Sequence, residues 1–478
     1  MPIRVALHRF ESDPALQQRD GVNLAHTEIN RLLEEEAPPG LRAEFHDFDR
    51  LLRDPRYAAE TLAGVDCVLC NVGPHAHYYH QLRERMGLSF RIVRDIKTAL
   101  WSGYLLQESL CEPYLRPGDA LLATSHYSRV LARRLFPHLA HRPVHLFEPV
   151  LASVSERGWV AGPAHDPSRQ VTLGYVGRLS EDKNFPQVVD VLVELDRAEP
   201  GRYRLVAVGA VHSASCDPAQ VARDIAARTG RDDLFTYRPP VPHGDVLGVL
   251  REFDYFLFFS TSNLEVLGRV LVEAGCGGIP ILAANHAAAS ELVAPSSLLE
   301  VTYTLGQRFH SHFDLPLGKV DTAAAVARIR SGFIPEAPPE PRMNRPGTLM
   351  AVLLDSGSAA IDDEPDALTP EEDRLIDRLH WENLPRFASL REVQPSMDIL
   401  LDWFLALNGK RGADFEARLA ELSRRSAFIE RTRRFIATTA TTRCDFTNLG
   451  GIDIELCNIA GYHPRFWLAD PGKPGYFS

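Results

Sequence analysis

The fold is most readily predicted from one segment of the sequence, Leu173-Gly-Tyr-Val-Gly-Arg-Leu-Ser-Glu-Asp-Lys-Asn184. An apolar strand runs into Gly177, and a helix is expected to begin near Phe185. Gly177 has no Cβ, so a ligand can approach the backbone closely there. Arg178 and Lys183 lie on the loop between strand and helix, where the helix N-terminus attracts anions. The loop therefore suits a diphosphate, although an ordinary loop with surface charges is an equally good interpretation.

Short apolar runs that alternate with helical patterns continue after this segment. Such almost wholly apolar strands are typical of a parallel sheet covered by helices on both faces. We expect strands at Val171–Val176, Tyr203–Val208, Leu234–Tyr237, Tyr255–Phe259 and Pro280–Ala283, with helices at Pro186–Leu195 and Ala219–Arg228.

The same alternation occurs earlier in the chain. Strands are expected at Ile3–Leu7, Val65–Cys70, Phe90–Val93 and Ala120–Ala123, and a helix at Val22–Leu33. Two doubly wound α/β domains in tandem place a cleft between them, lined by the carboxyl ends of the strands.

The length of 478 residues predicts about three domains. We expect an N-terminal domain over 1–150, a linker over 151–170 and a second α/β domain over 171–330. Residues 331–369 are Pro-rich and then acidic, which indicates an exposed linker or insertion. Residues 370–478 are expected to form a helical extension and tail of unknown role.

The composition is that of a globular protein, with 45% apolar and 24% charged residues. The net charge of −11 argues against a nucleic-acid partner, because such partners require a basic surface. The chain has seven cysteines, without the dense spacing of a disulfide framework. We find neither a signal peptide nor a run of 18 apolar residues, and therefore predict a soluble, cytoplasmic protein.

A second informative segment is Ser260–Pro280, in which a polar loop follows an apolar strand. We predict a helix that carries both Glu265 and Glu273. Eight helical residues rise about 12 Å and turn by about 80° net, so both carboxylates would lie on one broad side. That separation suits a sugar hydroxyl and a ribose with a diphosphate between them. The alternative is a pair of solvated glutamates, but a carboxylate on so apolar a helix needs a partner.

Three motifs occur in order: Gly177-Arg-Leu with Lys183, Glu265 with Glu273, and Cys276-Gly-Gly-Ile-Pro280. Together they resemble the signature of the retaining GT-B glycosyltransferases of glycosyltransferase family 4. Ser290-Glu291-Leu also resembles a turn of that family. The resemblance is specific over 171–295, diffuse over 1–150 and absent beyond about 330.

The resemblance implies an α/β protein of the GT-B fold, with two Rossmann-like doubly wound domains facing a cleft. It implies transfer of a sugar from a nucleotide-diphosphate sugar to an acceptor hydroxyl, with retention. Arg178 and Lys183 would hold the diphosphate and offset its developing charge. Glu265 would hydrogen-bond the donor sugar, and Glu273 would hold the ribose.

The resemblance also implies a binding role for several loops. Backbone amides near Leu267 and Gly268 would contact the diphosphate. Gly209 and the stretch from Arg238 to Val241 would flank the nucleobase. Gly21 would lie near the diphosphate and the acceptor.

Two departures from the family pattern affect the site. The family often has Glu-Gly-Phe-Gly, whereas this chain has Glu265-Val-Leu-Gly268. Many members place a histidine in the region that here reads Phe90-Arg-Ile-Val-Arg-Asp95. Arg94 or Asp95 is expected to take that place: Arg94 would contact phosphate, or Asp95 would position an acceptor hydroxyl or a sugar hydroxyl. The alternative is a salt-bridged pair at a strand end.

The resemblance implies neither a catalytic metal nor a cofactor besides the donor substrate. The expected acceptor is a small molecule, a glycan or a lipid-linked molecule. His75, His77 and His80 cluster after a strand and are candidates for acceptor binding or, less well supported, for a metal. The basic run Arg133–Arg142 is either a solvated helix end or a surface for peripheral contact with anionic lipid. The oligomeric state is left open.

Two other patterns indicate structure. Cys67 and Cys70 are three apart on a strand, so their thiols face opposite sides of the sheet as core residues. Ser125-His-Tyr-Ser128 is typical of a capped helix start. The competing functions are a GT-B phosphorylase or epimerase, and a sugar-nucleotide-binding protein without catalysis.

Overall fold

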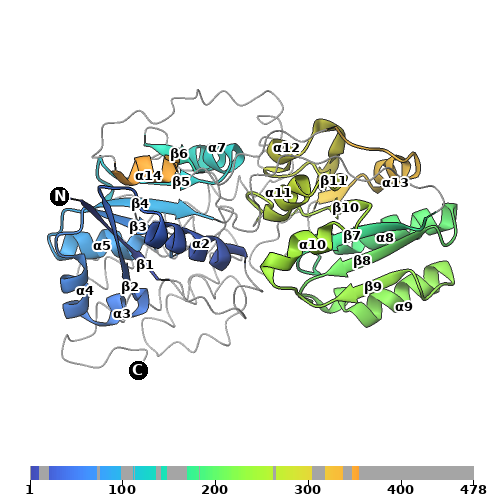
Figure 1. Ribbon diagram of the computed structural model, residues 1–478, viewed down its shortest axis with the longest axis horizontal. Helices are drawn as coiled ribbons and strands as arrows, with labels where there is room; N and C mark the ends of the chain where they lie inside the picture. Colours follow the sequence, from blue (N-terminus) through green and yellow to red (C-terminus); the bar gives the residue numbers. More distant parts are fainter. Residues whose placement is uncertain are drawn as a thin grey trace, which may run out of the picture.

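Two α/β domains lie side by side in the protein (Figure 1). A computed structural model describes residues 2–9, 21–72, 76–97, 111, 114–135, 142–147, 169–181, 183–261, 265–303, 318–336 and 347–354. The expected extension over 370–478, most of the linker 151–170, and most of the basic run Arg133–Arg142 lie outside these residues. Within them, no helix is both long enough and apolar enough to cross a bilayer.

The N-terminal domain contains a six-stranded parallel sheet in the order β2-β1-β3-β4-β5-β6. Its strands are β1 (Ile3–His8), β2 (Leu41–His46), β3 (Cys67–Cys70), β4 (Arg91–Ile96), β5 (Ala120–Ala123) and β6 (Val144–Leu146). Its helices are α2 (Gly21–Glu35), α3 (Phe48–Arg53), α4 (Pro55–Leu62), α5 (His77–Arg85) and α7 (His126–Leu135).

Two hydrophobic clusters pack on opposite faces of this sheet, and the cysteines of β3 divide between them. Cys67 packs with Leu7 in one cluster, and Cys70 packs with Ala6 in the other. Both are buried free thiols, and burial raises the pKa of each. The prediction of opposite-facing core cysteines is therefore confirmed.

The C-terminal domain contains a second six-stranded parallel sheet, in the order β12-β11-β10-β7-β8-β9. Its strands are β7 (Val171–Val176), β8 (Tyr203–Val208), β9 (Phe235–Arg238), β10 (Tyr255–Phe258), β11 (Ile281–Ala284) and β12 (Leu298–Leu299). Its helices are α8 (Phe185–Ala198), α9 (Pro218–Thr229), α10 (Val246–Leu250), α11 (Arg269–Cys276), α12 (Ala289–Leu292) and α13 (Thr322–Arg330). The short 3₁₀ helices are η4 (Ala214–Cys216), η5 (His243–Asp245) and η6 (Pro295–Ser297), and β13 (Val301–Tyr303) pairs antiparallel with β14 (Gly318–Val320).

The tandem of two parallel sheets is confirmed, and the predicted strands lie within a few residues of the observed ones. Sequence patterning did not reveal β2, β6 and β12. All three lie at sheet edges. β2 is only partly buried and carries Arg42 and Glu44, so it lacks the apolar pattern of a central strand.

The region expected to be an exposed linker contains α14 (Gly347–Leu354), and for these eight residues that expectation was wrong. Leu349, Val352 and Leu353 are buried in the core of the N-terminal domain. The Arg91 guanidinium donates to the carbonyl oxygens of Val352 and Leu353 at the end of the helix. The chain therefore returns from the C-terminal domain to complete the N-terminal one, as the position of α14 beside β4 and β5 shows (Figure 1).

Replacement of Leu353 by alanine tests this packing. A fully buried leucine that is truncated to alanine costs about 2–5 kcal/mol, so the melting temperature of the N-terminal domain should fall clearly. The matched control is Ile334→Ala, because Ile334 is 57% exposed. Equal melting temperatures for the two variants, measured by calorimetry, would show that α14 does not contribute to the core.

Candidate functional site

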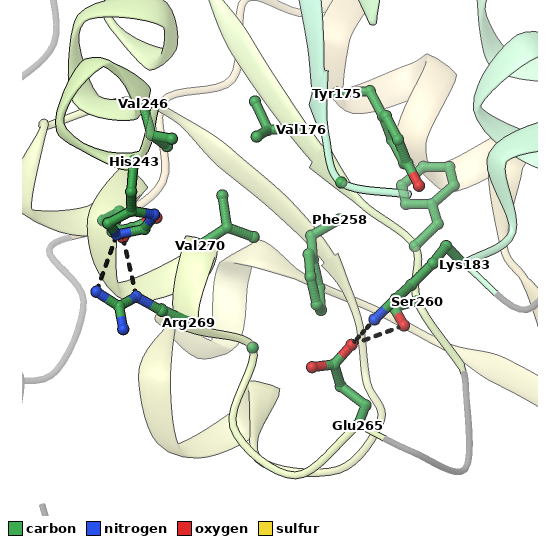
Figure 2. A pocket seen from close by; sticks show the side chains of 14 residues that line it. Tyr175, Val176, Lys183, His243, Val246, Phe258, Ser260, Glu265, Arg269 and Val270 are labelled. Carbon is green, nitrogen blue, oxygen red and sulfur yellow. Dashed lines mark hydrogen bonds and ion pairs between the residues drawn. The ribbon is translucent and has the colours of Figure 1, made fainter. Parts of the chain in front are cut away.

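A cavity of about 260 Å³ lies at the carboxyl ends of β7 and β10 in the C-terminal domain. This is the edge of the sheet at which doubly wound proteins bind ligands. The predicted site residues that line it are Gly177, Lys183, Glu265, Gly268 and Glu273. Figure 2 shows Lys183 and Ser260 directed toward the Glu265 carboxylate, with His243 and Arg269 on the opposite side of the cavity.

Close contact between two backbone segments forms the floor of the β7–α8 loop. Gly177 and Gly209 have φ angles of 151° and 150°, which favour glycine. A Cβ on Gly209 would lie 1.8 Å from the Gly177 carbonyl oxygen. Gly209 therefore acts beneath Gly177, and in the described residues it does not line the cavity.

Asn184 fixes the start of α8 and with it the position of Lys183. It has a left-handed backbone, with φ 52°. Its buried side-chain amide donates to the carbonyl oxygens of Phe259 and Gly318, both at 2.9 Å. The β7–α8 loop is thus attached to the end of β10, and Lys183 is directed toward the Glu265 loop.

Lys183 and Glu265 form an ion pair across the cavity, and the Ser260 hydroxyl donates to the same carboxylate oxygen at 3.0 Å. Burial raises the pKa of Glu265, but Lys183 and Ser260 outweigh burial and hold the pKa below its ordinary value. Glu265 is therefore a carboxylate at neutral pH, able to accept hydrogen bonds from hydroxyl groups.

The prediction that one helix carries both glutamates was wrong. α11 begins at Arg269, so Glu265 lies in the preceding loop and only Glu273 is helical. Gly268 has φ 75°, a left-handed conformation that cannot continue a right-handed helix. Both carboxylates nevertheless line the same cavity, because the loop turns back at Gly268.

Glu273 belongs to a charged cluster that sequence analysis did not find. Its Oε1 lies 2.7 Å from His243 Nε2 and 3.3 Å from Arg269 Nε. Arg269 also makes a bidentate contact, at 2.7 and 2.8 Å, with Glu28 of α2 in the N-terminal domain. The four-residue spacing of Arg269 and Glu273 was a detectable signal, whereas the contacts with His243 and Glu28 come from the fold.

The other predicted residues have different positions. Arg178 and Leu267 are partly exposed loop residues outside the cavity lining, and Val241 packs against the hydrophobic core near α10. Gly21 is the first residue of α2. Several residues that we predicted to contact the diphosphate or the base therefore lie outside the cavity lining.

Asp95 lies in β4 with its side chain buried, in the N-terminal domain. Its carboxylate is 3.2 Å from Lys97 Nζ and 3.7 Å from His26 Nδ1. Burial raises the pKa of Asp95, against the opposing effect of Lys97. Asp95 is therefore ion-paired at a strand end, with Lys97 as its partner.

The start of α7 connects the two domains. Ser125 and Ser128 cap the helix, since Ser128 N donates to Ser125 Oγ at 3.1 Å. Glu291 of α12 accepts from the backbone amides of His126 and Tyr127, both at 2.9 Å. Ser125 Oγ also donates to the carbonyl of Val266, next to Glu265. The predicted cap is confirmed, and the C-terminal domain completes it.

Residues 164–303 match the family model "Glycosyl transferases group 1". This part of the chain is therefore similar to the group 1 glycosyltransferases. The match includes the cavity, both glutamates, Lys183 and Glu291. The two parallel sheets form a GT-B fold, as expected from the resemblance.

The chain is also similar to individual proteins. D-inositol 3-phosphate glycosyltransferase of Saccharomonospora viridis is 30% identical over 122 residues, which are 25% of this chain and 28% of that relative. The chain thus matches less than a third of that relative's length. Anabaena HepE, in complex with UDP and glucose, is 17% identical with a TM-score of 0.44, covering 61% of this chain and 83% of its own. Sucrose-phosphate synthase of Thermosynechococcus elongatus is 14% identical with a TM-score of 0.46, covering 82% and 99%.

No group of three or more His, Cys, Asp or Glu side chains in the described ranges is arranged to hold a metal ion. His75 lies outside those ranges. His80 is fully buried, with Nδ1 3.8 Å from Asp119 Oδ2. His80 therefore faces the core of the N-terminal domain, and the acceptor role predicted for the histidine cluster does not apply to it.

Substitution of Gly209 by alanine should disturb the loop floor. The added methyl group would collide with the Gly177 carbonyl, so we expect a lower melting temperature. Gly248→Ala is the matched control, because a Cβ there meets no atom within 4 Å. If both variants melt like the wild type, the close approach of the two loops is not required.

The Glu265–Lys183 pair should make stability depend on pH. Because the folded-state pKa of Glu265 is lowered, its stabilisation is complete above about pH 4.3, the ordinary value, and is lost as the pH falls through the folded-state pKa. The difference in melting temperature between wild type and Glu265→Gln should therefore shrink in acid. The exposed Glu60→Gln serves as control, and a difference that stays constant with pH would contradict the assignment.

Proposed function

We propose that the protein is a glycosyltransferase that moves a sugar from a nucleotide-diphosphate sugar to an acceptor hydroxyl, with retention of configuration. The observation that carries this proposal is the cavity that Lys183, Glu265 and Glu273 line, within the segment that matches the group 1 glycosyltransferase model. Positive charge at one wall and two carboxylates at others are suited to a ligand that combines a diphosphate with hydroxylated rings.

The donor diphosphate is proposed to bind at the β7–α8 loop. Lys183 has three N–H donors, so its pairing with Glu265 leaves donors for a phosphate oxygen. Arg178, on the same loop, adds a second cation. Together they would stabilise the charge that develops on the diphosphate as the sugar leaves. Backbone amides at Leu267 and Gly268, where α11 begins, would support the same group.

The two glutamates are proposed to hold the two rings of the donor. Glu265 is ionised and would accept hydrogen bonds from sugar hydroxyls, while Ser260 and Lys183 fix its orientation. Glu273, beside His243, would accept from the ribose. The loops at Gly209 and Val241 would flank the base, and Gly21 would lie near the acceptor.

We propose that the acceptor binds to the N-terminal domain. Asp95, held by its ion pair with Lys97, would position a hydroxyl there. The departing phosphate oxygen would accept the proton of the acceptor hydroxyl, so no side-chain base is required. We also propose that the reaction needs no metal ion, because Lys183 and Arg178 supply the positive charge next to the diphosphate.

A thermal-shift screen against UDP-, GDP-, ADP- and dTDP-sugars tests donor binding. A donor that binds only the folded protein raises the melting temperature by mass action. The same screen with EDTA tests whether a metal is needed. Binding followed by transfer supports the proposal, whereas phosphate-dependent cleavage of a glycoside, epimerisation of the donor, or binding without any reaction would indicate the competing functions.

Substitutions at the cavity provide the test of the residues. With the donor found by the screen, Lys183→Ala should lower kcat by roughly 10²–10³-fold, the usual effect of removing one charge-stabilising donor. Glu265→Gln should also lower activity strongly, because the charged acceptor for the sugar is lost. Lys319→Ala, at an exposed lysine of β14, and Glu60→Gln are the controls. Full activity of both cavity variants would refute the site assignment.

A further inference from the structure

A buried ion pair joins the domains at the wall of the cavity that Arg269 and Glu273 line. Arg269, the first residue of α11, makes its bidentate contact with Glu28 of α2. The side chains of Arg269, Glu28 and Glu273 are only 16%, 6% and 3% exposed. Water screens so buried an interaction weakly, and loss of one partner leaves an uncompensated charge.

The position of Arg269 is unfavourable for α11 itself. A cation at a helix N-terminus opposes the helix dipole. An arginine four residues before a glutamate is also the weaker of the two orientations of such a pair. Local helix stability therefore does not account for an arginine at this position, and its contacts outside the helix do.

Arg269 reaches Glu273 and Glu28 with different nitrogen atoms. Nε lies 3.3 Å from Glu273 Oε1, while Nη1 and Nη2 contact the two carboxylate oxygens of Glu28. Nη2 also lies 2.9 Å from His243 Nε2, which is itself 2.7 Å from Glu273. One planar guanidinium thus connects the N-terminal domain to the carboxylate proposed to hold the ribose.

The charged groups continue into the N-terminal domain. Burial lowers the pKa of Lys97, its partner Asp95 and also Glu28 raise it, and Arg269 lowers it. The charges of Glu28 and Arg269 are therefore felt at Lys97, the partner of Asp95 on the proposed acceptor side. Another interdomain contact, between Glu291 and the start of α7, involves backbone amides and none of the side chains of this bridge.

We propose that Arg269 is a positioning residue that couples the orientation of Glu273 to the attachment of α2 through Glu28. This inference rests on the proposed function, since Glu273 is its nucleotide ligand. Through its contact with Glu28, Arg269 holds the N-terminal domain, which we propose binds the acceptor, in a fixed orientation relative to the donor site. Glu28 acts on this alignment alone, whereas Arg269 acts on both alignment and nucleotide binding.

The experiment compares Glu28→Gln, Arg269→Gln and Glu273→Gln in the full chain. Binding of UDP, GDP, ADP and dTDP is measured by calorimetry, transfer is measured at saturating donor, and small-angle scattering reports the separation of the domains. Glu34→Gln is the matched control, because Glu34 lies on the same helix but pairs with Arg9 at the exposed surface.

Glu28→Gln should bind nucleotide within about twofold of wild type but transfer the sugar roughly 10- to 100-fold more slowly, as expected for misaligned reactants. Its radius of gyration should exceed that of Glu34→Gln. Arg269→Gln should in addition weaken nucleotide binding roughly tenfold, as expected for a lost charged hydrogen bond. Arg269→Lys, which keeps the charge but loses the fork, should resemble Arg269→Gln in transfer.

Two results would overturn the inference. One is a Glu28→Gln variant that matches Glu34→Gln in transfer and scattering. The other is a Glu28→Gln variant that loses nucleotide affinity as severely as Glu273→Gln. If wild type binds none of the four diphosphates, the proposed function fails. The bridge is then still tested by scattering without nucleotide, where an unchanged radius of gyration in Glu28→Gln overturns it.

Discussion

The ion pair between Lys183 and Glu265 is the interaction on which the candidate site depends. It joins the loop after β7 to the loop after β10, two neighbouring strands of one sheet. Without a cation, Glu265 would be a carboxylate in a largely buried position, where the neutral acid is favoured. Without Glu265, Lys183 would lose the carboxylate with which it pairs, in a cavity that also contains apolar side chains such as Phe258. The geometry of the two loops and the charge state of the cavity are therefore determined together.

Much of the fold could be predicted from the sequence because the central strands are apolar and the glycines mark the loops. The edge strand β2 could not, because Arg42 and Glu44 reflect its partial exposure. The start of α11 was misplaced because the apolar pattern is continuous across Gly268, and only its φ of 75° shows that the helix cannot include it. α14 was hidden by the proline-rich residues before it.

The candidate site also contains some residues that the sequence predicts and others that only the fold reveals. Lys183, Glu265 and Glu273 could be found from the order and spacing of motifs within one domain. His243 and Glu28 could not, because they approach Arg269 from elements far apart in the sequence. Asp95 was noticed at a strand end, but its partner Lys97 is defined only by the path of the chain after β4. Contacts between domains leave no periodic signal in either segment.

The return of the chain at α14 has a consequence for synthesis on the ribosome. The C-terminal sheet is continuous in sequence, so it can fold as soon as it has emerged. The N-terminal core lacks Leu349, Val352 and Leu353 until about 200 residues have been added after β6. At usual rates of translation this takes roughly 10–40 s. During that interval the apolar residues that share this cluster, such as Leu122 and Phe147, lack the contacts of α14.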